Sequence, residues 1–450
     1  MEYLTLQIEL LRDYLWSAPL SLLMVATGLW LTWCLKGLQF TLLPKAFSLV
    51  LRSRSDAENQ GPGELTHFQA LMTSLAAAIG TGNIAGVATA LVSGGPGSLL
   101  WMCIIASIGM IIKFAESFLA HHYRQKNEKG ESIGGPMYYL EKVSGATYLS
   151  FAFALFGTLA TVGTGNMVQV HSVTDAALSF MGIPKLWSGI LLSLLTAAVL
   201  FGGIRSIGRI AEVFVPVMGA AYLVGGCWVI YVHLDMLPTV LYQIVDAAFT
   251  LRSAAGGAAG FTLGQALQAG VSRGIFSNEA GLGTSSIAAA TAKSNSSYDQ
   301  ALISMTGAFL STFVVCMVTG IVICITQVQG EINPSSGLPL NGAPLAMAAF
   351  EKGFSGGAGF VSMSLIFFAY STILGWAYYG EKCVEYLVGT KGVLPYRTLY
   401  VAIMVPAALM ELHLVWAIAD LANALMAIPN LIGLLLGTTY IANYIRQSES

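Results

Sequence analysis

Charged side chains are scarce in this sequence. Asp, Glu, Lys and Arg make up 10% of its 450 residues, whereas soluble domains carry about 25%. The formal net charge of −2 gives no basic excess with which to bind nucleic acid. The motifs HExxH and GxxxxGK(S/T), which accompany zinc proteolysis and ATP binding, are also missing. These absences argue against a soluble enzyme, an ATP-driven pump and a nucleic-acid-binding protein.

Cysteine pairs at metal-binding spacing are absent as well. The six cysteines lie in or beside apolar runs, and none forms a CxxC pair. We interpret them as small apolar side chains, not as a disulfide framework or a metal site. Met1–Tyr14 is polar and acidic, and no small-residue cleavage site follows the first apolar run, so no cleavable signal peptide is expected.

Apolar residues dominate what is present. They make up 55% of the chain, and the mean hydropathy is +0.70, which predicts an all-α polytopic membrane protein. At about 20 apolar residues per span we predict about eleven transmembrane helices. They lie near Leu15–Leu38, Phe68–Val92, Ser98–His121, Ser150–Val173, Leu186–Gly203, Ala211–Tyr231, Thr262–Ala292, Ala301–Gln327, Phe360–Leu387, Thr398–Leu414 and Val415–Tyr440.

The distribution of Lys and Arg predicts the orientation. If the N-terminus lies outside, most basic residues fall in inner loops and at inner helix ends. The outer side then holds only Arg12, Lys185, Arg252 and Lys352. Because cytoplasmic loops carry the excess of Lys and Arg, we expect the N-terminus outside and the C-terminus in the cytoplasm.

The second predicted span contains a polar interruption. Ala76–Gly86 reads AAAIGTGNIAG within the apolar run Phe68–Val92. Each glycine weakens a helix interior by roughly 0.5–1 kcal/mol relative to alanine, and a carboxamide in hydrocarbon is costly without partners. We therefore expect a break near the bilayer centre, which is tolerated only where it lines a protected cavity.

A second interruption stands at the matching position of the chain. Without the first span, ten spans remain as five plus five, and an odd number per half inverts the second half. Thr262–Ala292 opens that half and contains the polar run Ser277–Glu279 among glycines. Matched breaks are typical of secondary transporters; the alternative is chance, since the chain has 49 glycines. We predict an N-terminal extra helix and loop over 1–63, a first repeat over 64–235 and an inverted repeat over 236–450.

Two flanking segments also carry predictions. Ile133–Tyr139, on the inner side, is read as a short amphipathic segment at the membrane interface. The outer stretch Leu338–Phe354 is expected to contain a short helical lid, with Pro344 in its first turn.

Four stretches together resemble a known family, the alanine/glycine:cation symporters, over nearly the whole chain. They are GTGNIAGVATA, SIGGPMYYLEK, GTGNMVQ and RGIFSNEAGLGTSS. That family is similar in fold to the leucine-transporter group, with two inverted five-helix repeats and broken first and sixth core helices. The resemblance implies uptake of alanine or glycine with sodium, sometimes with protons, in a prokaryotic plasma membrane.

A zwitterion needs donors for its carboxylate and acceptors for its ammonium. Free N–H groups at the start of a half-helix suit the carboxylate, and Gly82, Asn83 and the Thr81 hydroxyl are placed for this. Unpaired carbonyls around Ala78 and Phe276 suit the ammonium. The other substrate-binding candidates are Gln169, Phe276, Ser277, Asn278 and Trp376. The resemblance places Gln169 in the site; the alternative is an interhelical hydrogen bond without ligand. Phe276 and Trp376 are expected to wall a small pocket, although Trp376 also fits an ordinary packing role.

Sodium prefers hard oxygen ligands. The hydroxyls of Ser371 and Thr372, facing carbonyls of Ala76 and Ile79, are our candidate sodium ligands, because in the related fold an ion lies between those two helices. The alternative is that both hydroxyls bond back to their own helix.

The partners and roles of several charged residues in or near the spans remain open. Arg273 and Glu279 flank the second break, so each needs a partner; a mutual or cross-helix salt bridge and a proton-carrying Glu279 are both considered. Lys113 and Glu116 are expected to pair near the inner face. Asp420 has no evident partner and is assigned to a water-filled inner vestibule.

The sequence thus predicts a sodium-coupled symporter for alanine or glycine, not an enzyme, in contact with membrane lipid and without an obligate protein partner. A proton-coupled or broader carrier of small neutral amino acids is the alternative within transport. An intramembrane hydrolase using Asp420 and Glu279 lacks a recognised motif, and a channel would not occlude its ligand. The choice between D- and L-alanine stays open.

Overall fold

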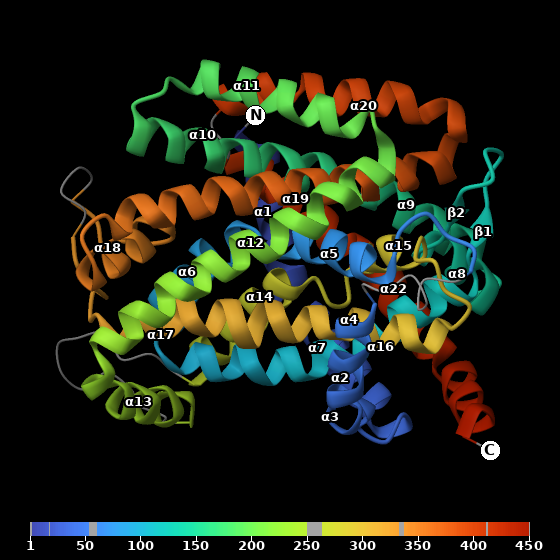
Figure 1. Cartoon of the computed structure of the whole chain (residues 1–450), viewed down its shortest axis with the longest axis horizontal. Helices are drawn as coiled ribbons and strands as arrows, with labels where there is room; N and C mark the ends of the chain where they lie inside the picture. Colours follow the sequence, from blue (N-terminus) through green and yellow to red (C-terminus); the bar gives the residue numbers. More distant parts are fainter. Residues whose placement is uncertain are drawn as a thin grey trace.

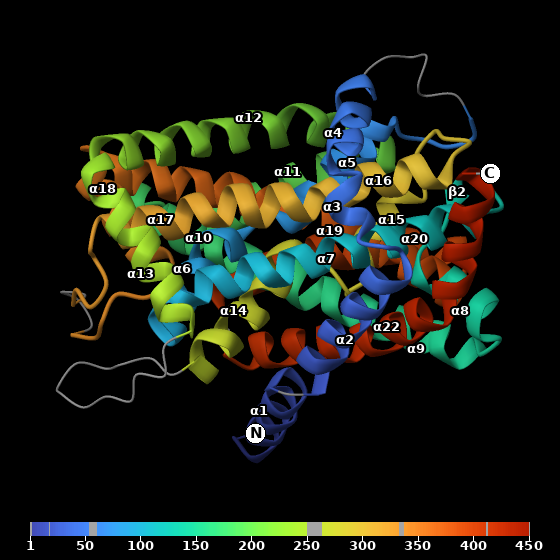
Figure 2. The ribbon, with the colours of Figure 1, turned by 90° about the horizontal axis from the view of Figure 1, so that it is seen from below.

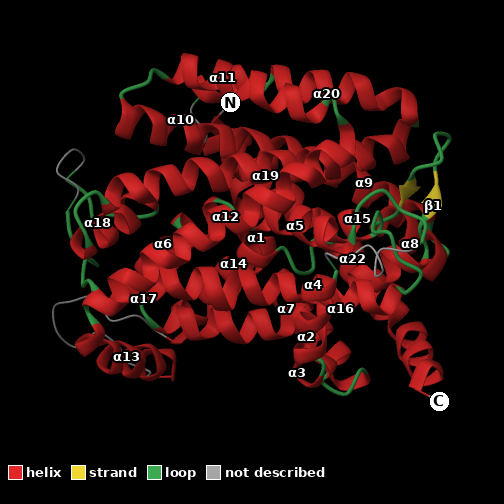
Figure 3. Ribbon diagram, viewed as in Figure 1, coloured by secondary structure: helices red, strands yellow, loops and turns green. Residues whose placement is uncertain are grey.

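The computed structural model describes residues 2–17, 19–53, 61–249, 263–332, 337–410 and 413–449. Almost all of this is helix, with one pair of short strands at one end of the molecule (Figure 3). The long helices run roughly along one axis; α13 and α18 lie at one end, and β1, β2, α8 and the C-terminus at the other (Figure 1). Predicted features at Arg252 and at Thr262 lie outside the described residues.

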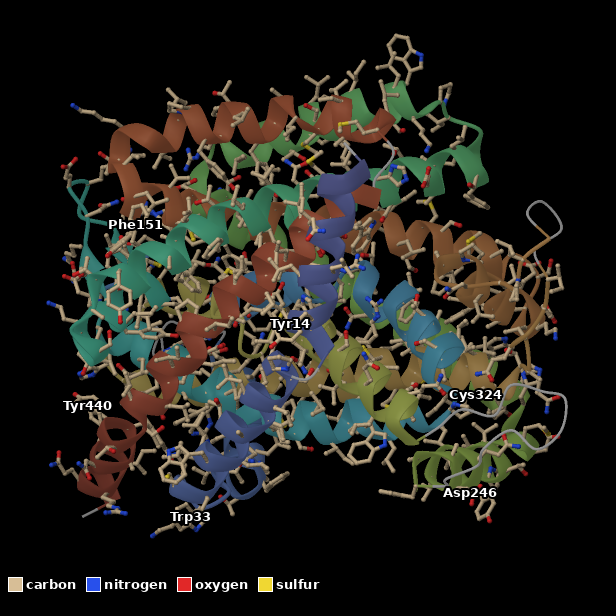
Figure 4. The ribbon with its side chains drawn as sticks, turned by 180° about the vertical axis from the view of Figure 1, so that it is seen from behind. Tyr14, Trp33, Phe151, Asp246, Cys324 and Tyr440 are labelled. Atoms are coloured by element: carbon tan, nitrogen blue, oxygen red, sulfur yellow. The ribbon has the colours of Figure 1, made fainter. Side chains whose placement is uncertain are left out.

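The N-terminal helices cross the direction of the others. They are α1 (Glu2–Ser17), α2 (Pro19–Cys34), α3 (Leu38–Thr41) and α4 (Leu43–Arg52). Figure 2 shows this segment passing obliquely over the bundle, with α1 protruding from its lower edge. Seen from behind, Tyr14 of α1 lies over the middle of the molecule and Trp33 of α2 at its lower margin (Figure 4). Trp33 is exposed, as suits a side chain that faces lipid.

The predicted first repeat contains the first interrupted helix and four uninterrupted passes. Its elements are α5 (His67–Ala78), η1 (Thr81–Asn83), α6 (Ala85–Gly94), α7 (Gly97–His122), β1 (Gln125–Lys126), β2 (Ser132–Ile133), α8 (Pro136–Ser144), α9 (Thr147–Val162), η2 (Gly163–Met167), α10 (Val168–Met181), α11 (Lys185–Leu200) and α12 (Gly203–Val232). The interface segment predicted at Ile133–Tyr139 is the end of an antiparallel β1–β2 hairpin followed by α8. The hairpin is too short to show a period-2 pattern in the sequence.

The remaining elements start at η3, which ends at residue 236, where the predicted second repeat begins. These are η3 (Leu234–Met236), α13 (Leu237–Phe249), then α14 (Leu263–Asn278), α15 (Thr284–Ala289), α16 (Ser297–Ala308), η4 (Phe309–Cys316), α17 (Met317–Ile325), α18 (Ala343–Gly353), α19 (Gly357–Val388), η5 (Thr390–Gly392), α20 (Val393–Ala402), α21 (Met404–Leu409) and α22 (His413–Glu449). The short helix predicted within Leu338–Phe354 is α18, and Pro344 lies in its first turn as predicted.

Eight helices of the described part are long and apolar enough to cross a membrane. The shorter apolar helix α11 and the interrupted helices α5–α6 and α14–α15 complete the predicted spans. The two halves interlock, since α7 packs on α14 and α16, and α9 packs on α19 and α22. The boundaries at 1–63, 64–235 and 236–450 stay a prediction. All six cysteines are free thiols; Cys227 is exposed, which the sequence did not indicate.

Candidate functional site

The first predicted break is confirmed. A capping box of Thr66 and Gln69 starts α5, and the helix ends at Ala78, where the backbone turns at Ile79 and Gly80 before η1 begins. The N–H groups of Thr81 and Gly82 donate no hydrogen bond within the described part of the chain. They are the first, unpaired donors of a new helical segment, which is a favourable place for a carboxylate.

The second predicted break follows directly after Asn278. Glu279, Gly281 and Gly283 all have positive φ, at 55°, 85° and 78°, so the chain leaves the helix in a left-handed turn. Ala280 donates its N–H to Asn278 Oδ1 at 2.9 Å and not to the backbone. The carbonyl of Phe276 consequently accepts no hydrogen bond among the described residues.

The two breaks meet at a small enclosed cavity, called the central cavity below. Its volume is about 20 Å³, which is space for about one water molecule. Gly82 lies against the Phe276 ring so closely that a Cβ there would be 2.8 Å from Cδ1. The lining residues are Ala77, Ala78, Gly80, Thr81, Gly82, Thr164, Gln169, Phe276, Glu279, Leu282, Thr372, Trp376 and Asn423. A large side chain has no room in this conformation.

A π-helical turn presents polar groups to this cavity. Such turns widen a helix locally and often occur at functional sites. Turn η2 carries Thr164, whose carbonyl accepts from Gln169 Nε2 at 3.2 Å. Gln169 Oε1 accepts from the Thr81 hydroxyl at 3.3 Å, and Asn423 Nδ2 donates to Thr164 Oγ1 at 2.9 Å. Three helices far apart in the chain thus converge on one polar wall.

Five predicted substrate residues line the cavity: Thr81, Gly82, Gln169, Phe276 and Trp376. The other three lie behind it. Asn83 accepts from Gly80 N at 3.1 Å and donates to Ser311 Oγ at 2.7 Å. Ser277 and Asn278 both approach the Thr312 hydroxyl, at 3.1 and 3.4 Å. These three polar side chains brace the two breaks against turn η4.

The predicted sodium residues come together in part. Hydroxyls of Ser371 and Thr372 each lie 3.2 Å from the Ala76 carbonyl. Both also approach the Phe368 carbonyl of their own helix, at 2.8 and 3.1 Å, so the back-bonding alternative is present in the same geometry. The Ile79 carbonyl accepts no hydrogen bond in the described part of the chain, which leaves it free to act as a ligand.

The predicted direct pairing of Lys113 with Glu116 was wrong. Glu116 Oε1 instead accepts from Gly281 N, Gly283 N and Asn430 Nδ2 at 2.9, 3.0 and 2.7 Å. The Lys113 ammonium is buried and has no hydrogen-bond partner among the described residues. The reason is that the second break leaves orphaned N–H groups, and the carboxylate of Glu116 satisfies them.

If the N-terminus lies outside as predicted, the cavity that Asp420 lines opens toward the outer side and not toward an inner vestibule. Asp420 lines a separate cavity of about 460 Å³ together with Ser93 and Gln265, which lie at the end of α6 and the start of α14. Phe276 lines both this cavity and the smaller one at which the two breaks meet. Arg273 lines the same cavity and is within electrostatic reach of Asp420. Arg273 therefore faces Asp420, and Glu279 bonds elsewhere.

Sequence reasoning missed Thr164, Leu282 and Asn423 as lining residues. The available signals were weak: Asn423 is a carboxamide within an apolar span, and Thr164 belongs to the GTGN motif that precedes Gln169. Polar residues within membrane spans usually face the bundle interior. Which of them meet at one cavity depends on how α10 and α22 are rotated.

Broken helices that meet at an enclosed cavity inside a helical membrane bundle define a secondary transporter. The fold agrees with solved structures. The chain is similar to MhsT in complex with L-phenylalanine, with a TM-score of 0.58, 14% identity and coverage of 84% of this chain and 89% of that one. It is also similar to a Na⁺-coupled sialic acid symporter, with a TM-score of 0.53, 14% identity and coverage of 90% and 83%. The fold is that of the leucine-transporter group.

The chain belongs to the sodium:alanine symporter family, whose model matches residues 1–449. It is 45% identical to the sodium/alanine symporter AgcS of Methanococcus maripaludis, over 100% of this chain and 99% of the relative. An uncharacterized transporter of Haemophilus influenzae is 43% identical, over 95% and 92%. The probable sodium/glutamine symporter GlnT of Bacillus subtilis is 36% identical, over 98% and 91%. The protein is therefore a multi-pass membrane transporter.

Proposed function

We propose that this chain carries out sodium-coupled symport of alanine or glycine into the cell by alternating access. The observation that carries the proposal is that the N–H groups of Thr81 and Gly82 and the carbonyl of Phe276, none of them paired within the described residues, belong to the lining of one small cavity. A zwitterion has an acceptor end and a donor end, and this site offers the complement of both.

Each end of the substrate has candidate partners. The carboxylate binds at the start of η1, where the helix dipole is positive. The ammonium binds the Phe276 carbonyl and the Asn423 carboxamide oxygen, which is buried and has no partner in the described part of the chain. The side chain packs against Phe276 and Trp376. An occluded cavity of about 20 Å³ favours hydrogen or methyl over anything longer.

The coupling ion binds beside the first break. Sodium takes the Ala76 and Ile79 carbonyls and the Ser371 and Thr372 hydroxyls as ligands, by analogy with other hard cations. The bound ion then bridges α5 and α19, and the bound substrate bridges η1 and α14. Since each ligand orders the same break, each binds better when the other is present, and this coupling is reciprocal.

We further propose that the N-terminus lies outside and the C-terminus in the cytoplasm of a prokaryotic plasma membrane. The end that carries the hairpin and α8 is then the inner end, consistent with its concentration of Lys and Arg. The cavity lined by Asp420 and Arg273 then opens outward. No protein partner is needed for this cycle.

The test is uptake of labelled alanine and glycine into proteoliposomes with and without an inward sodium gradient. We expect uptake that saturates, depends on sodium and supports counterflow. Equal rates with and without sodium remove the sodium hypothesis. A broader or proton-coupled carrier is the second candidate, because relatives named as a probable sodium/glutamine symporter and a putative sodium/proton-dependent alanine carrier protein are 36% and 32% identical. A glutamine arm and a proton-gradient arm of the same assay distinguish it.

A further inference from the structure

The indole of Trp376 is fixed at both ends. At its base, Gly165 passes so close that a Cβ there would lie 2.2 Å from Trp376 Cβ. At its far side, Nε1 donates to Glu279 Oε1 at 2.7 Å. Trp376 is 2% exposed and Glu279 is 2% exposed, and both line the central cavity. A buried hydrogen bond to a carboxylate is short and strong, so the ring cannot rotate without losing it.

Glu279 occupies a backbone conformation that disfavours it. Its φ of 55° is in the left-handed region, at the position just after α14 where glycine is usual. A non-glycine residue in such a conformation is held there by its surroundings, and strained residues concentrate at functional sites. The left-handed turn aims the side chain across the cavity toward α19, where Trp376 lies.

A buried cation balances this carboxylate. Lys113 of α7 is within electrostatic reach of both Glu279 and Glu116. Glu116 Oε1 is occupied by donors from the second break. An uncompensated carboxylate inside a membrane bundle is expensive, so Lys113 allows Glu279 to sit beside the cavity as a strong acceptor.

We propose that Glu279 is a positioning residue that holds the Trp376 indole as a rigid wall and thereby sets the upper limit on substrate side-chain size. This proposal rests on the proposed function. A pocket rejects one extra methylene only when its wall does not yield. Without the hydrogen bond the indole can swing about its side-chain torsions, and the cavity admits branched and longer aliphatic side chains.

Three changes test the proposal in the reconstituted full-length protein. Glu279→Leu removes the acceptor at similar volume, and Glu279→Gln removes the charge but keeps an acceptor oxygen. Replacing Trp376 by 3-benzothienylalanine keeps the ring shape and removes only the N–H. The control is Glu141→Leu, which removes an exposed carboxylate of α8. Each protein is assayed for inhibition of labelled alanine binding by glycine, alanine, 2-aminobutyrate, valine and leucine.

We expect Glu279→Leu and the benzothienyl analogue to lower the valine-to-alanine ratio of inhibition constants by about tenfold or more. Glu279→Gln and the control should keep the ratio. A protein that combines Glu279→Leu with the analogue should show no larger drop in the ratio than either change alone, because both changes remove the same hydrogen bond. If Glu279→Leu does not fold, the ratio measured in the benzothienyl protein decides whether the proposal holds.

Two results overturn the proposal. One is an unchanged ratio in the benzothienyl protein with alanine still bound, which also leaves the proposed function standing. The other is an equal loss of selectivity in Glu279→Gln and Glu279→Leu, which would assign the effect to charge and not to the hydrogen bond. If the unsubstituted protein binds neither alanine nor glycine, the proposed function itself fails, and the positioning role fails with it.

Discussion

Asn423 donates to the Thr164 hydroxyl across 2.9 Å, and its own carboxamide oxygen is buried with no hydrogen-bond partner among the residues that the structure describes. Both residues line the central cavity, from α22 and from turn η2. Buried polar atoms are nearly always hydrogen-bonded, so an exception at a cavity wall calls for a ligand. An ammonium group is the partner that fits an oxygen acceptor at this position.

Asn423→Leu tests that assignment. Hydrogen bonds to charged groups contribute about 1.5–3 kcal/mol, so we expect alanine affinity to fall by about tenfold or more. Equilibrium binding at saturating sodium measures it. Thr438→Val on the same helix is the matched control, because within the described residues its hydroxyl bonds only back to the Leu434 carbonyl. Unchanged affinity in Asn423→Leu would place the ammonium elsewhere.

Ser371→Ala and Thr372→Ala test the ion site. Each removes one of the few oxygen ligands, so the sodium concentration for half-maximal uptake should rise on the order of tenfold. The alanine constant at saturating sodium should change less. Ser364→Ala on the same helix is the control, since Ser364 bonds back to Phe360 and lies away from the break. If all three variants keep the same sodium dependence, the hydroxyls serve only their own helix.

Gly165→Ala tests the close approach of turn η2 to α19. The added methyl would lie 2.2 Å from Trp376 Cβ, and neither atom is at a flexible end, so overpacking should cost about 1–3 kcal/mol. Thermal unfolding in detergent and alanine binding should both weaken. Gly219→Ala on α12 has open space around the new methyl and serves as the control. Wild-type stability in Gly165→Ala would show that the turn can relax.

Asn83→Leu and Gln169→Leu should both lose substrate binding, for different reasons. Asn83 caps Gly80 N and bonds Ser311, so its loss leaves buried groups unpaired at about 1–3 kcal/mol and lowers the melting temperature. Gln169 faces the cavity, so its loss should reduce affinity with less effect on unfolding. Thermal unfolding and binding measured on the same preparations separate the two. Equal stability losses would contradict this division.

Glu64 should make stability depend on pH. Its carboxylate accepts from Ser132 N at 2.8 Å, joining the chain before α5 to the hairpin, and burial raises its pKa above the ordinary 4.5. The folded state therefore binds the Glu64 proton more tightly than the unfolded state does. The stability that this proton binding contributes is fully present below pH 4.5 and is lost as pH rises through the folded pKa. Glu64→Gln keeps an acceptor oxygen and should flatten this part of the profile. Identical profiles for both proteins would remove Glu64 as the source.

The sequence by itself determined the all-α membrane-spanning class and both helix breaks. Each of these depends on local properties: apolar length, glycine content and a few polar residues near the bilayer centre. Thr81, Gly82 and Gln169 belong to motifs that carry the family resemblance, so they too were predicted. The pairing of Ser371 and Thr372 with the Ala76 carbonyl followed from the same related fold.

Only the tertiary structure decided which polar side chains share a cavity and which brace it. Asn83 donates a hydrogen bond to Ser311 of η4, and Asp420 interacts electrostatically with Arg273. Glu279 accepts a hydrogen bond from Trp376, which is 97 positions away in the chain. Such pairings depend on the rotation of each helix about its axis and on its depth in the bundle. A hydropathy profile carries little information about helix rotation or depth, because most residues on every side of a membrane helix are apolar. Packing of small residues such as Gly165 fixes them instead.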